Sequence, residues 1–154
     1  HEVSAVVLCV MGIAKVLHRR PLVSGFIDKD AKLQTNLPAA LISASATIDE
    51  DCVITHNASV SPKAVIGKYN MLHSRCTIGH DIKMGDFNFI GAQVVFYWLF
   101  QIGSDNMFWG NSAIIPAIEV GNNDTIVAGM ILAKPVSDDE INFFRCKEKI
   151  VITK

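Results

Sequence analysis

The sequence predicts a parallel β-helix of triangular cross-section, in which short strands coil around one apolar core. The first observation is a period of six, since apolar residues occupy every sixth position without interruption. The sixteen sites are Ile42, Ile48, Ile54, Val60, Ile66, Leu72, Ile78, Met84, Ile90, Phe96, Ile102, Phe108, Ile114, Val120, Ile126 and Leu132. The second is a mostly small residue two positions before each site, and the third is a glycine that often follows the site. With half of all residues hydrophobic, sixteen apolar matches in succession have a chance probability on the order of 10⁻⁵ in any one register.

Each six-residue unit accounts for one strand and one corner. The strand points alternate side chains inward, and we expect the recurring glycines to form corners whose backbone angles other residues resist. These are Gly67, Gly79, Gly85, Gly91, Gly103 and Gly121. Three units close a coil of about 18 residues, and successive coils stack as parallel strands about 4.8 Å apart. Residues 43–135 therefore give about five coils, in which Ile78, Phe96 and Ile114 stack in one buried column. An array of amphipathic helices would need apolar spacings of three and four instead.

The repeat divides the chain into residues 1–40, 41–135 and 136–154. In the first segment, Ala5–Val10 predicts a buried strand and Gly12–Val23 a helix packed on it. Because a lone strand and helix make no stable domain, we expect residues 1–40 to be the end of a larger α/β unit.

The last segment, residues 136–154, lacks the six-residue period. Ser137–Glu140 is a capping-box pattern, which predicts a short helix through Phe144. Ile150–Thr153 predicts a short strand after it.

The composition excludes several classes of protein. A formal net charge of −1 gives no electrostatic footprint of a nucleic-acid binder. The hydrophobic half of the residues excludes a disordered chain and favours burial of apolar surface in an oligomer. Cys9, Cys52, Cys76 and Cys146 form no CxxC pair, which argues against a disulfide framework or a zinc ribbon. Ala5–Ile13 is too short to cross a bilayer and its positive charges follow it, so we expect no membrane partner and a cytoplasmic location.

The segment from Leu41 to Pro135 resembles the left-handed parallel β-helix of the hexapeptide acyltransferases. Asn36-Leu-Pro, Ile42-Ser-Ala-Ser-Ala-Thr-Ile48 and Ile78-Gly-His-Asp-Ile-Lys-Met-Gly-Asp-Phe87 are similar to stretches of bacterial nucleotide-sugar N-acetyltransferases and sialic-acid O-acetyltransferases. The resemblance implies an all-β left-handed helix and a Rossmann-like N-terminal domain that ends within residues 1–40. It also implies acetyl-coenzyme A as acyl donor, a sugar or nucleotide-sugar acceptor with an amino or hydroxyl group, no metal, and a homotrimer with clefts between subunits.

The resemblance places the general base at His80, followed by Asp81 and standing ahead of Gly85-Asp86-Phe87. Attack on a thioester requires removal of a proton from the acceptor near neutral pH, where imidazole titrates. Asp81 would orient the ring and stabilise its cation.

Two positions depart from the family pattern. Eighteen residues after His80 the family usually has glycine, whose N–H is an oxyanion donor, and here Trp98 stands there. The Trp98 N–H could still serve, while its bulky side chain reshapes or blocks the pantetheine path. Nine residues after His80 the family often has a second histidine, and here that residue is Phe89. Lys134 matches a basic residue near the coenzyme A phosphates.

Alternative interpretations remain open at this point. The protein could be a non-catalytic trimeric scaffold, which Phe89 and Trp98 favour. His56, His73 and His80 raise a zinc-dependent, carbonic-anhydrase-like site, although their separations of 17 and 7 do not match that family. The aromatic group of Phe96–Phe100 with Trp109 is expected in the core or between subunits. Cys52 and Cys76 fall on inward positions, where we expect inert thiols.

Overall fold

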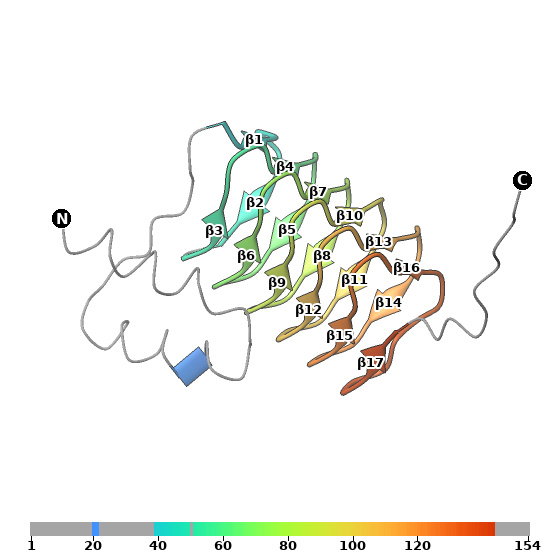
Figure 1. Ribbon diagram of the computed structural model, residues 1–154. Helices are drawn as coiled ribbons and strands as arrows, with labels where there is room; N and C mark the ends of the chain where they lie inside the picture. Colours follow the sequence, from blue (N-terminus) through green and yellow to red (C-terminus); the bar gives the residue numbers. More distant parts are fainter. Residues whose placement is uncertain (1–19, 22–38, 50, 144–154) are drawn as a thin grey trace, which may run out of the picture.

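The computed structural model describes residues 20–21, 39–49 and 51–143, which form the left-handed parallel β-helix that the sequence predicts. Its two-residue strands divide among three parallel sheets (Figure 1). The first sheet contains β1 (Leu41–Ile42), β4 (Ser59–Val60), β7 (Thr77–Ile78), β10 (Val95–Phe96), β13 (Ala113–Ile114) and β16 (Ile131–Leu132). The second contains β2 (Thr47–Ile48), β5 (Val65–Ile66), β8 (Lys83–Met84), β11 (Gln101–Ile102) and β14 (Glu119–Val120). The third contains β3 (Val53–Ile54), β6 (Met71–Leu72), β9 (Phe89–Ile90), β12 (Met107–Phe108), β15 (Thr125–Ile126) and β17 (Ile141–Asn142).

The sheets meet at three corners, which we name by the direction of the chain. The first corner leads from the first sheet to the second, the second corner from the second sheet to the third, and the third corner from the third sheet back to the first. Within the repeat, paired residues are 18 apart, as in Phe96 with Ile78 and with Ile114. These three side chains are fully buried in one column, as the sequence predicts.

The six recurring glycines do not supply the left-handed backbone of the corners, contrary to the expectation from the sequence, although Gly129 does so at one later corner. From Asp51 to Asn123 every sixth residue has a φ between 57° and 64°, and none of these residues is glycine. The recurring glycines stand instead where one coil approaches the next. A Cβ atom on Gly79 would lie 1.3 Å from the carbonyl oxygen of Tyr97. Glycine is needed there because the neighbouring backbone leaves no space for a side chain.

The coil continues beyond Pro135, where the sequence predicted that the repeat stops. Val136 forms a parallel bridge with Val120, and Asn142 of β17 pairs with Ile126, so the offset is 16 residues instead of 18. The first corner after β16 is therefore two residues shorter than the earlier ones, which puts the chain out of step with a count of six. The predicted helix over 137–143 is wrong, because Ser137–Glu140 forms a second corner and leads into strand β17.

A ladder of buried polar side chains follows the second corner from coil to coil. Its members are Asn70, Asn88, Asn106 and Asp124. Each side-chain oxygen accepts a hydrogen bond from the backbone N–H one coil further on, ending with Glu140 N to Asp124 Oδ1 at 2.8 Å. The amides also donate to carbonyls, as Asn70 Nδ2 does to Gly67 and Gly85 at 2.8 Å. The Asp124 side chain has no amide group to donate, and its Oδ2 has no partner among the described residues. Burial raises the pKa of this carboxyl.

The two cysteines of the described chain are free and lie in the core. Burial raises the pKa of the Cys52 thiol to about 11 and that of the Cys76 thiol to about 12. The prediction that these side chains point inward is confirmed, and the shifted pKa values agree with inert thiols.

Most of the two flanking segments lies outside the described residues, including Ala5–Val10, the greater part of 12–23, and Ile150–Thr153. Arg20 and Pro21 have helical backbone, in agreement with the helix expected there. The Arg20 guanidinium donates to both carboxylate oxygens of Asp105, at 3.0 and 2.6 Å. Within the described part of the chain, there is no helix with the length and hydrophobicity to span a membrane.

Candidate functional site

The first corner brings the four residues of the predicted site onto one edge of the prism. Pro62, His80, Trp98 and Pro116 follow one another at intervals of 18 and occupy the same place in successive coils, and Lys134 lies in the shortened corner of the next coil. Asp81 is the next residue of the corner and has the left-handed φ of 57°. Asparagine and aspartate tolerate this conformation better than most side chains do. Because one coil contains 18 residues, side chains that are 18 positions apart in the sequence become neighbours along this edge.

His80 and Asp81 form a hydrogen-bonded pair on this edge. The His80 Nδ1 lies 2.7 Å from Asp81 Oδ2, and the two side chains are 52% and 39% exposed. Because a carboxylate only accepts hydrogen bonds, Nδ1 is assigned as the nitrogen that carries hydrogen, which in the neutral imidazole leaves the lone pair on Nε2. The backbone is fixed by bonds from Asp81 N to Pro62 O and from Leu99 N to His80 O, both 3.2 Å long. The pair can accept a proton from a molecule bound at the surface.

Trp98 contributes a ring and an unused donor to the same edge. Its indole lies parallel to the His80 imidazole, with ring centroids 6.0 Å apart and 6° between the planes. The backbone N–H of Trp98 makes no hydrogen bond within the described residues. At the second corner the corresponding N–H of Asp86 is capped by Ser104 Oγ, one coil further on, at 3.0 Å. The residue one coil beyond Trp98 is Pro116, which has no side-chain oxygen to play that part.

Lys134 lies on the same edge, three coils beyond His80, at the shortened corner after β16. Three coil spacings correspond to about 14 Å along the axis of the helix. The side chain is exposed. It is therefore placed at the end of an extended surface that begins at the His80–Asp81 pair.

Two hollows lie over the second sheet, and the smaller one borders this edge whereas the larger one extends to the second corner. A hollow of 290 Å³ is lined by Asp81, Lys83, Leu99, Phe100 and Gln101. A larger one of 670 Å³ lies further along the helix, and Gln101 borders both. Asp81 belongs to the smaller hollow, so the acid–base pair adjoins that one and not the larger.

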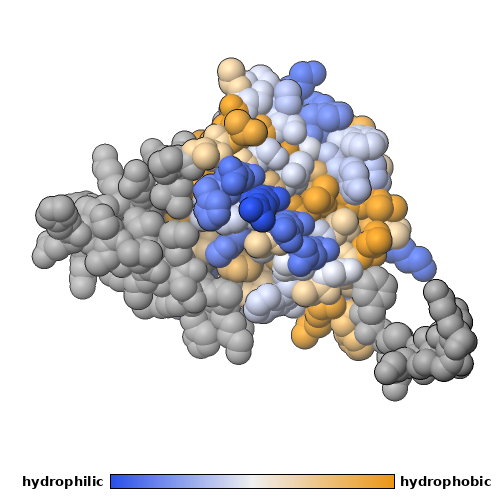
Figure 2. All heavy atoms as spheres, turned by 45° about the horizontal axis from the view of Figure 1, so that its top comes forward, coloured by the Kyte–Doolittle hydropathy of each residue, from blue (hydrophilic) through white to orange (hydrophobic). Residues whose placement is uncertain are grey.

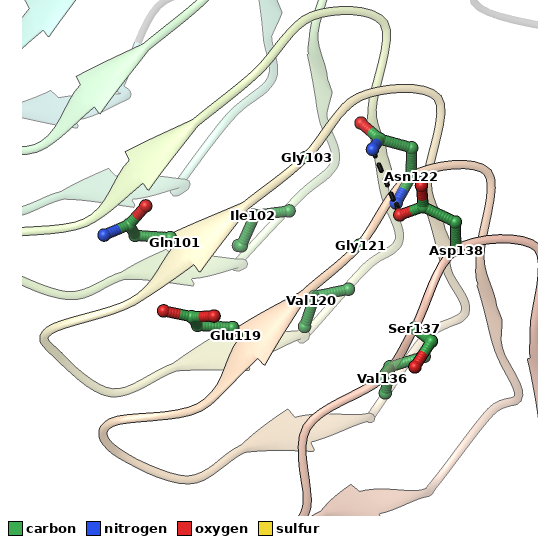
Figure 3. Close-up of a pocket in the computed structure, with 10 residues that line it drawn as sticks. All are labelled: Gln101, Ile102, Gly103, Glu119, Val120, Gly121, Asn122, Val136, Ser137 and Asp138. Atoms are coloured by element: carbon green, nitrogen blue, oxygen red, sulfur yellow. Dashed lines mark hydrogen bonds between the residues drawn. The ribbon is translucent and has the colours of Figure 1, made fainter.

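The larger hollow is lined by residues of β11 and β14, by Val136, and by the second corners that follow them. In the close-up of Figure 3, the side chains of Gln101 and Glu119 lie on one side of β11 and β14, and those of Ile102 and Val120 on the other. At the second corner Asn122 Nδ2 donates to Asp138 Oδ1 at 3.1 Å. Amide and carboxylate groups of this kind suit a ligand rich in hydroxyl or amino groups.

The other candidate residues of the sequence lie elsewhere. His56 and His73 are on the third corner, where His56 Nδ1 is 3.4 Å from Ser74 Oγ. One chain therefore does not bring them to His80, and no group of three metal-binding side chains forms within the described ranges. Phe89 is buried on the third sheet, where its ring contacts His73 and Trp109 at centroid distances of 5.0 and 6.3 Å.

The aromatic run divides between core and surface. Phe96 and Phe100 are core residues, as expected, whereas Tyr97, Trp98 and Leu99 are exposed at the first corner. Sequence reasoning also missed Lys83 and Gln101 as residues beside the site. The sequence feature that could have indicated them is the interval of 18 residues between them. It pairs Lys83 with Gln101 on the second sheet, where both line the smaller hollow together with Asp81.

Comparisons with known proteins support the architecture. The acetyltransferase domain of PglB from Neisseria gonorrhoeae, solved with acetyl coenzyme A, is 21% identical, with a TM-score of 0.79 over 84% of this chain and 63% of that one. A mutant of perosamine N-acetyltransferase from Caulobacter crescentus, solved with CoA and GDP-perosamine, is 16% identical, with a TM-score of 0.78 over 84% of this chain and 62% of that one. The likeness establishes the fold.

The chain spans less than two thirds of the length of both structures. No family model matches the sequence, and no curated protein matches it.

Proposed function

We propose that the protein is an acetyl-coenzyme A-dependent acyltransferase that acetylates an amino group of a nucleotide-linked sugar. The observation that carries the proposal is the His80–Asp81 pair, held at 2.7 Å on an exposed edge. The fold shared with acetyltransferase structures that were solved with CoA or acetyl coenzyme A supports the choice of donor. GDP-perosamine in one of them supports an amino sugar as acceptor.

The chemistry follows from the free Nε2 of His80. This nitrogen takes a proton from the acceptor amine as the amine nitrogen attacks the thioester carbonyl carbon. Asp81 accepts a hydrogen bond from the Nδ1 N–H and stabilises the imidazolium that forms. The Trp98 N–H is a donor for the oxyanion of the tetrahedral intermediate. When the carbon–sulfur bond breaks, the imidazolium returns a proton to the departing thiolate, which leaves as coenzyme A.

The two substrates are proposed to approach along the first corner and the second sheet. Lys134 offers a positive charge to the coenzyme A phosphates at the far end of the edge. The smaller hollow adjoins the His80–Asp81 pair, and the side chains of Lys83 and Gln101 that line it can form hydrogen bonds with hydroxyl groups, so this hollow suits the sugar whose amine reacts.

We further propose that the protein works as a homotrimer. Large apolar side chains remain exposed on the single chain, among them Leu41, Val65, Leu99 and Ile131. Figure 2 shows hydrophobic residues at the surface on either side of a hydrophilic band. Closed cyclic symmetry is a common way to cover such surface. Light scattering at micromolar concentration should give three times the mass of the chain, and a monomer would contradict the trimer.

The experiment that tests the function measures thiol release from acetyl-coenzyme A with amino sugars and nucleotide-linked amino sugars. His80→Ala should reduce kcat by about 10² to 10⁴ and leave acetyl-coenzyme A binding nearly intact. Asp81→Asn should have a smaller effect, because Nε2 keeps its position near the acceptor. The matched control is His56→Ala, since His56 lies on another corner and has no part in the mechanism.

Three results would count against the proposal. Unchanged activity in His80→Ala would show that this histidine is a surface residue without chemistry. Absence of acetyl-coenzyme A binding, measured as a failure to raise the melting temperature, would favour the scaffold interpretation. Loss of activity in His56→Ala, His73→Ala and His80→Ala together with loss of a bound metal would favour zinc chemistry.

A further inference from the structure

The stacked pair of His80 and Trp98 suggests a task for the indole side chain. We infer that Trp98 is a positioning residue, whose ring holds the His80 imidazole in the orientation that proton transfer needs. The inference rests on the proposed function. It concerns the side chain of Trp98, whereas the oxyanion donor described above is its backbone N–H.

The repeat itself creates the stack. His80 and Trp98 occupy the same position in successive coils, so their side chains leave the backbone in similar directions, about 4.8 Å apart. Their ring planes differ by only 6°, with centroids 6.0 Å apart, which is the range of offset-stacked aromatic pairs. The column continues with Pro62 on one side and Pro116 on the other, so each ring has the other as its planar neighbour in the column.

The two contacts of His80 restrict different motions. Asp81 holds Nδ1 in the plane of the imidazole, through the 2.7 Å hydrogen bond. That hydrogen bond alone would allow the ring plane to turn, and the indole of Trp98, which lies parallel to the imidazole, is the neighbour that opposes this motion in our inference. Tyr97 in turn meets the Trp98 ring edge-on, with centroids 5.7 Å apart and 87° between the planes. Together these contacts limit the orientations that Nε2 can adopt.

The backbone and side-chain parts of Trp98 can be separated by substitution. Trp98→Leu keeps the N–H but removes the aromatic face, and Trp98→Phe keeps a face of smaller area. The matched control is Trp109→Leu, because the Trp109 side chain is exposed to nearly the same extent, 42% against 41%, but lies on the third corner.

The kinetic test uses the thiol-release assay. Trp98→Leu should lower kcat about 10-fold with the KM for acetyl-coenzyme A unchanged, since orientation of the base and not donor binding is lost. Trp98→Phe should restore most of the lost rate, and Trp109→Leu should match the parent protein. In a His80→Ala background, Trp98→Leu should cause no further loss. A kcat for Trp98→Leu equal to that of the parent, or an equal loss in the His80→Ala background, would overturn the inference.

A second measurement does not depend on activity. The ring current of the indole should displace the His80 ring-proton resonances in the NMR spectrum, and Trp98→Leu should remove the displacement while Trp109→Leu leaves it. If the protein shows no transferase activity but this displacement is present, the proposed function fails and the positioning geometry stands. If the resonances do not respond to Trp98→Leu, the stack is absent and the inference fails.

Discussion

Replacing Asp124 by asparagine should stabilise the protein, because the ladder of the second corner is built for amides. Asp124 is 1% exposed, its Oδ1 accepts the Glu140 N–H at 2.8 Å, and its Oδ2 has no partner within the described chain. In two earlier coils the corresponding Nδ2 donates to a carbonyl three residues earlier, from Asn70 to Gly67 at 2.8 Å and from Asn88 to Gly85 at 3.2 Å. The amide introduced by Asp124→Asn would gain the same donor toward the carbonyl of Gly121.

The size of the effect follows from the buried oxygen. An unpaired buried polar atom costs about 1 to 3 kcal/mol. A gain of about 2 kcal/mol in the free energy of unfolding would raise the melting temperature by about 5 °C in a domain of this size. Thermal unfolding followed by circular dichroism measures this difference.

The stabilisation by Asp124→Asn should depend on pH, and the raised pKa of Asp124 determines whether it increases or decreases as the pH rises. Burial raises the pKa of the folded carboxyl above that of the unfolded chain. The neutral carboxyl is therefore the stable form, and its contribution is complete below about pH 4, the ordinary aspartate value, and lost as the pH rises through the folded pKa. The advantage of Asp124→Asn should be small in acid and grow toward neutral pH.

The control for this experiment is Asp139→Asn, which removes a neighbouring exposed charge and leaves the buried carboxyl in place. It should change the melting temperature much less than Asp124→Asn does. The reasoning would be refuted by an Asp124→Asn protein that is no more stable than the parent at pH 8. An advantage of equal size at pH 4 and pH 8 would refute the part of the argument that depends on ionisation.

Two further predictions concern the core and the coil spacing. Gly79→Ala should destabilise the fold by about 3 kcal/mol, because the new Cβ would overlap the backbone of the next coil, whereas Gly110→Ala, with its nearest atom at 3.0 Å, should cost less in chemical denaturation. Cys52 and Cys76 should react with a thiol reagent at pH 8 only as fast as the protein unfolds, since burial raises the pKa of both thiols. Rapid labelling of either of these two residues in the native protein, located by mass spectrometry of its peptides, would contradict this.

The six-residue period predicts the three stacked parallel sheets because each apolar site repeats in the same structural place, whereas the left hand of the coil came from the family resemblance. Ile78, Phe96 and Ile114 follow from counting alone, and the same count aligns Trp98 with His80. The count failed after Leu132, where a corner two residues shorter changes the offset to 16. A loss of two residues leaves no local signature, so Ser137–Glu140 was interpreted as a helix cap although it forms a corner.

Other features depend on contacts between coils, which a single sequence does not display. The six-residue period predicts where the glycines recur, but it does not explain why glycine is required there. The carbonyl of Tyr97 that excludes a side chain at Gly79 belongs to the next coil. The pairing of His80 with Asp81 could be expected from adjacent positions. The parallel stacking of the Trp98 ring on His80 required the three-dimensional arrangement, because its bulk suggested obstruction when only the sequence was considered.

Because successive coils stack at a constant spacing, residues along the first corner lie at fixed intervals along the axis of the helix. Groups on that edge can be separated only by whole coils, about 4.8 Å each, so the span from His80 to Lys134 can change in steps of that size and not continuously. Insertion of one 18-residue coil between them would move a charge by one interval without disturbing either local environment. In such a scaffold, the length of an elongated substrate can be matched by the number of repeats, independently of the side chains that carry out the chemistry.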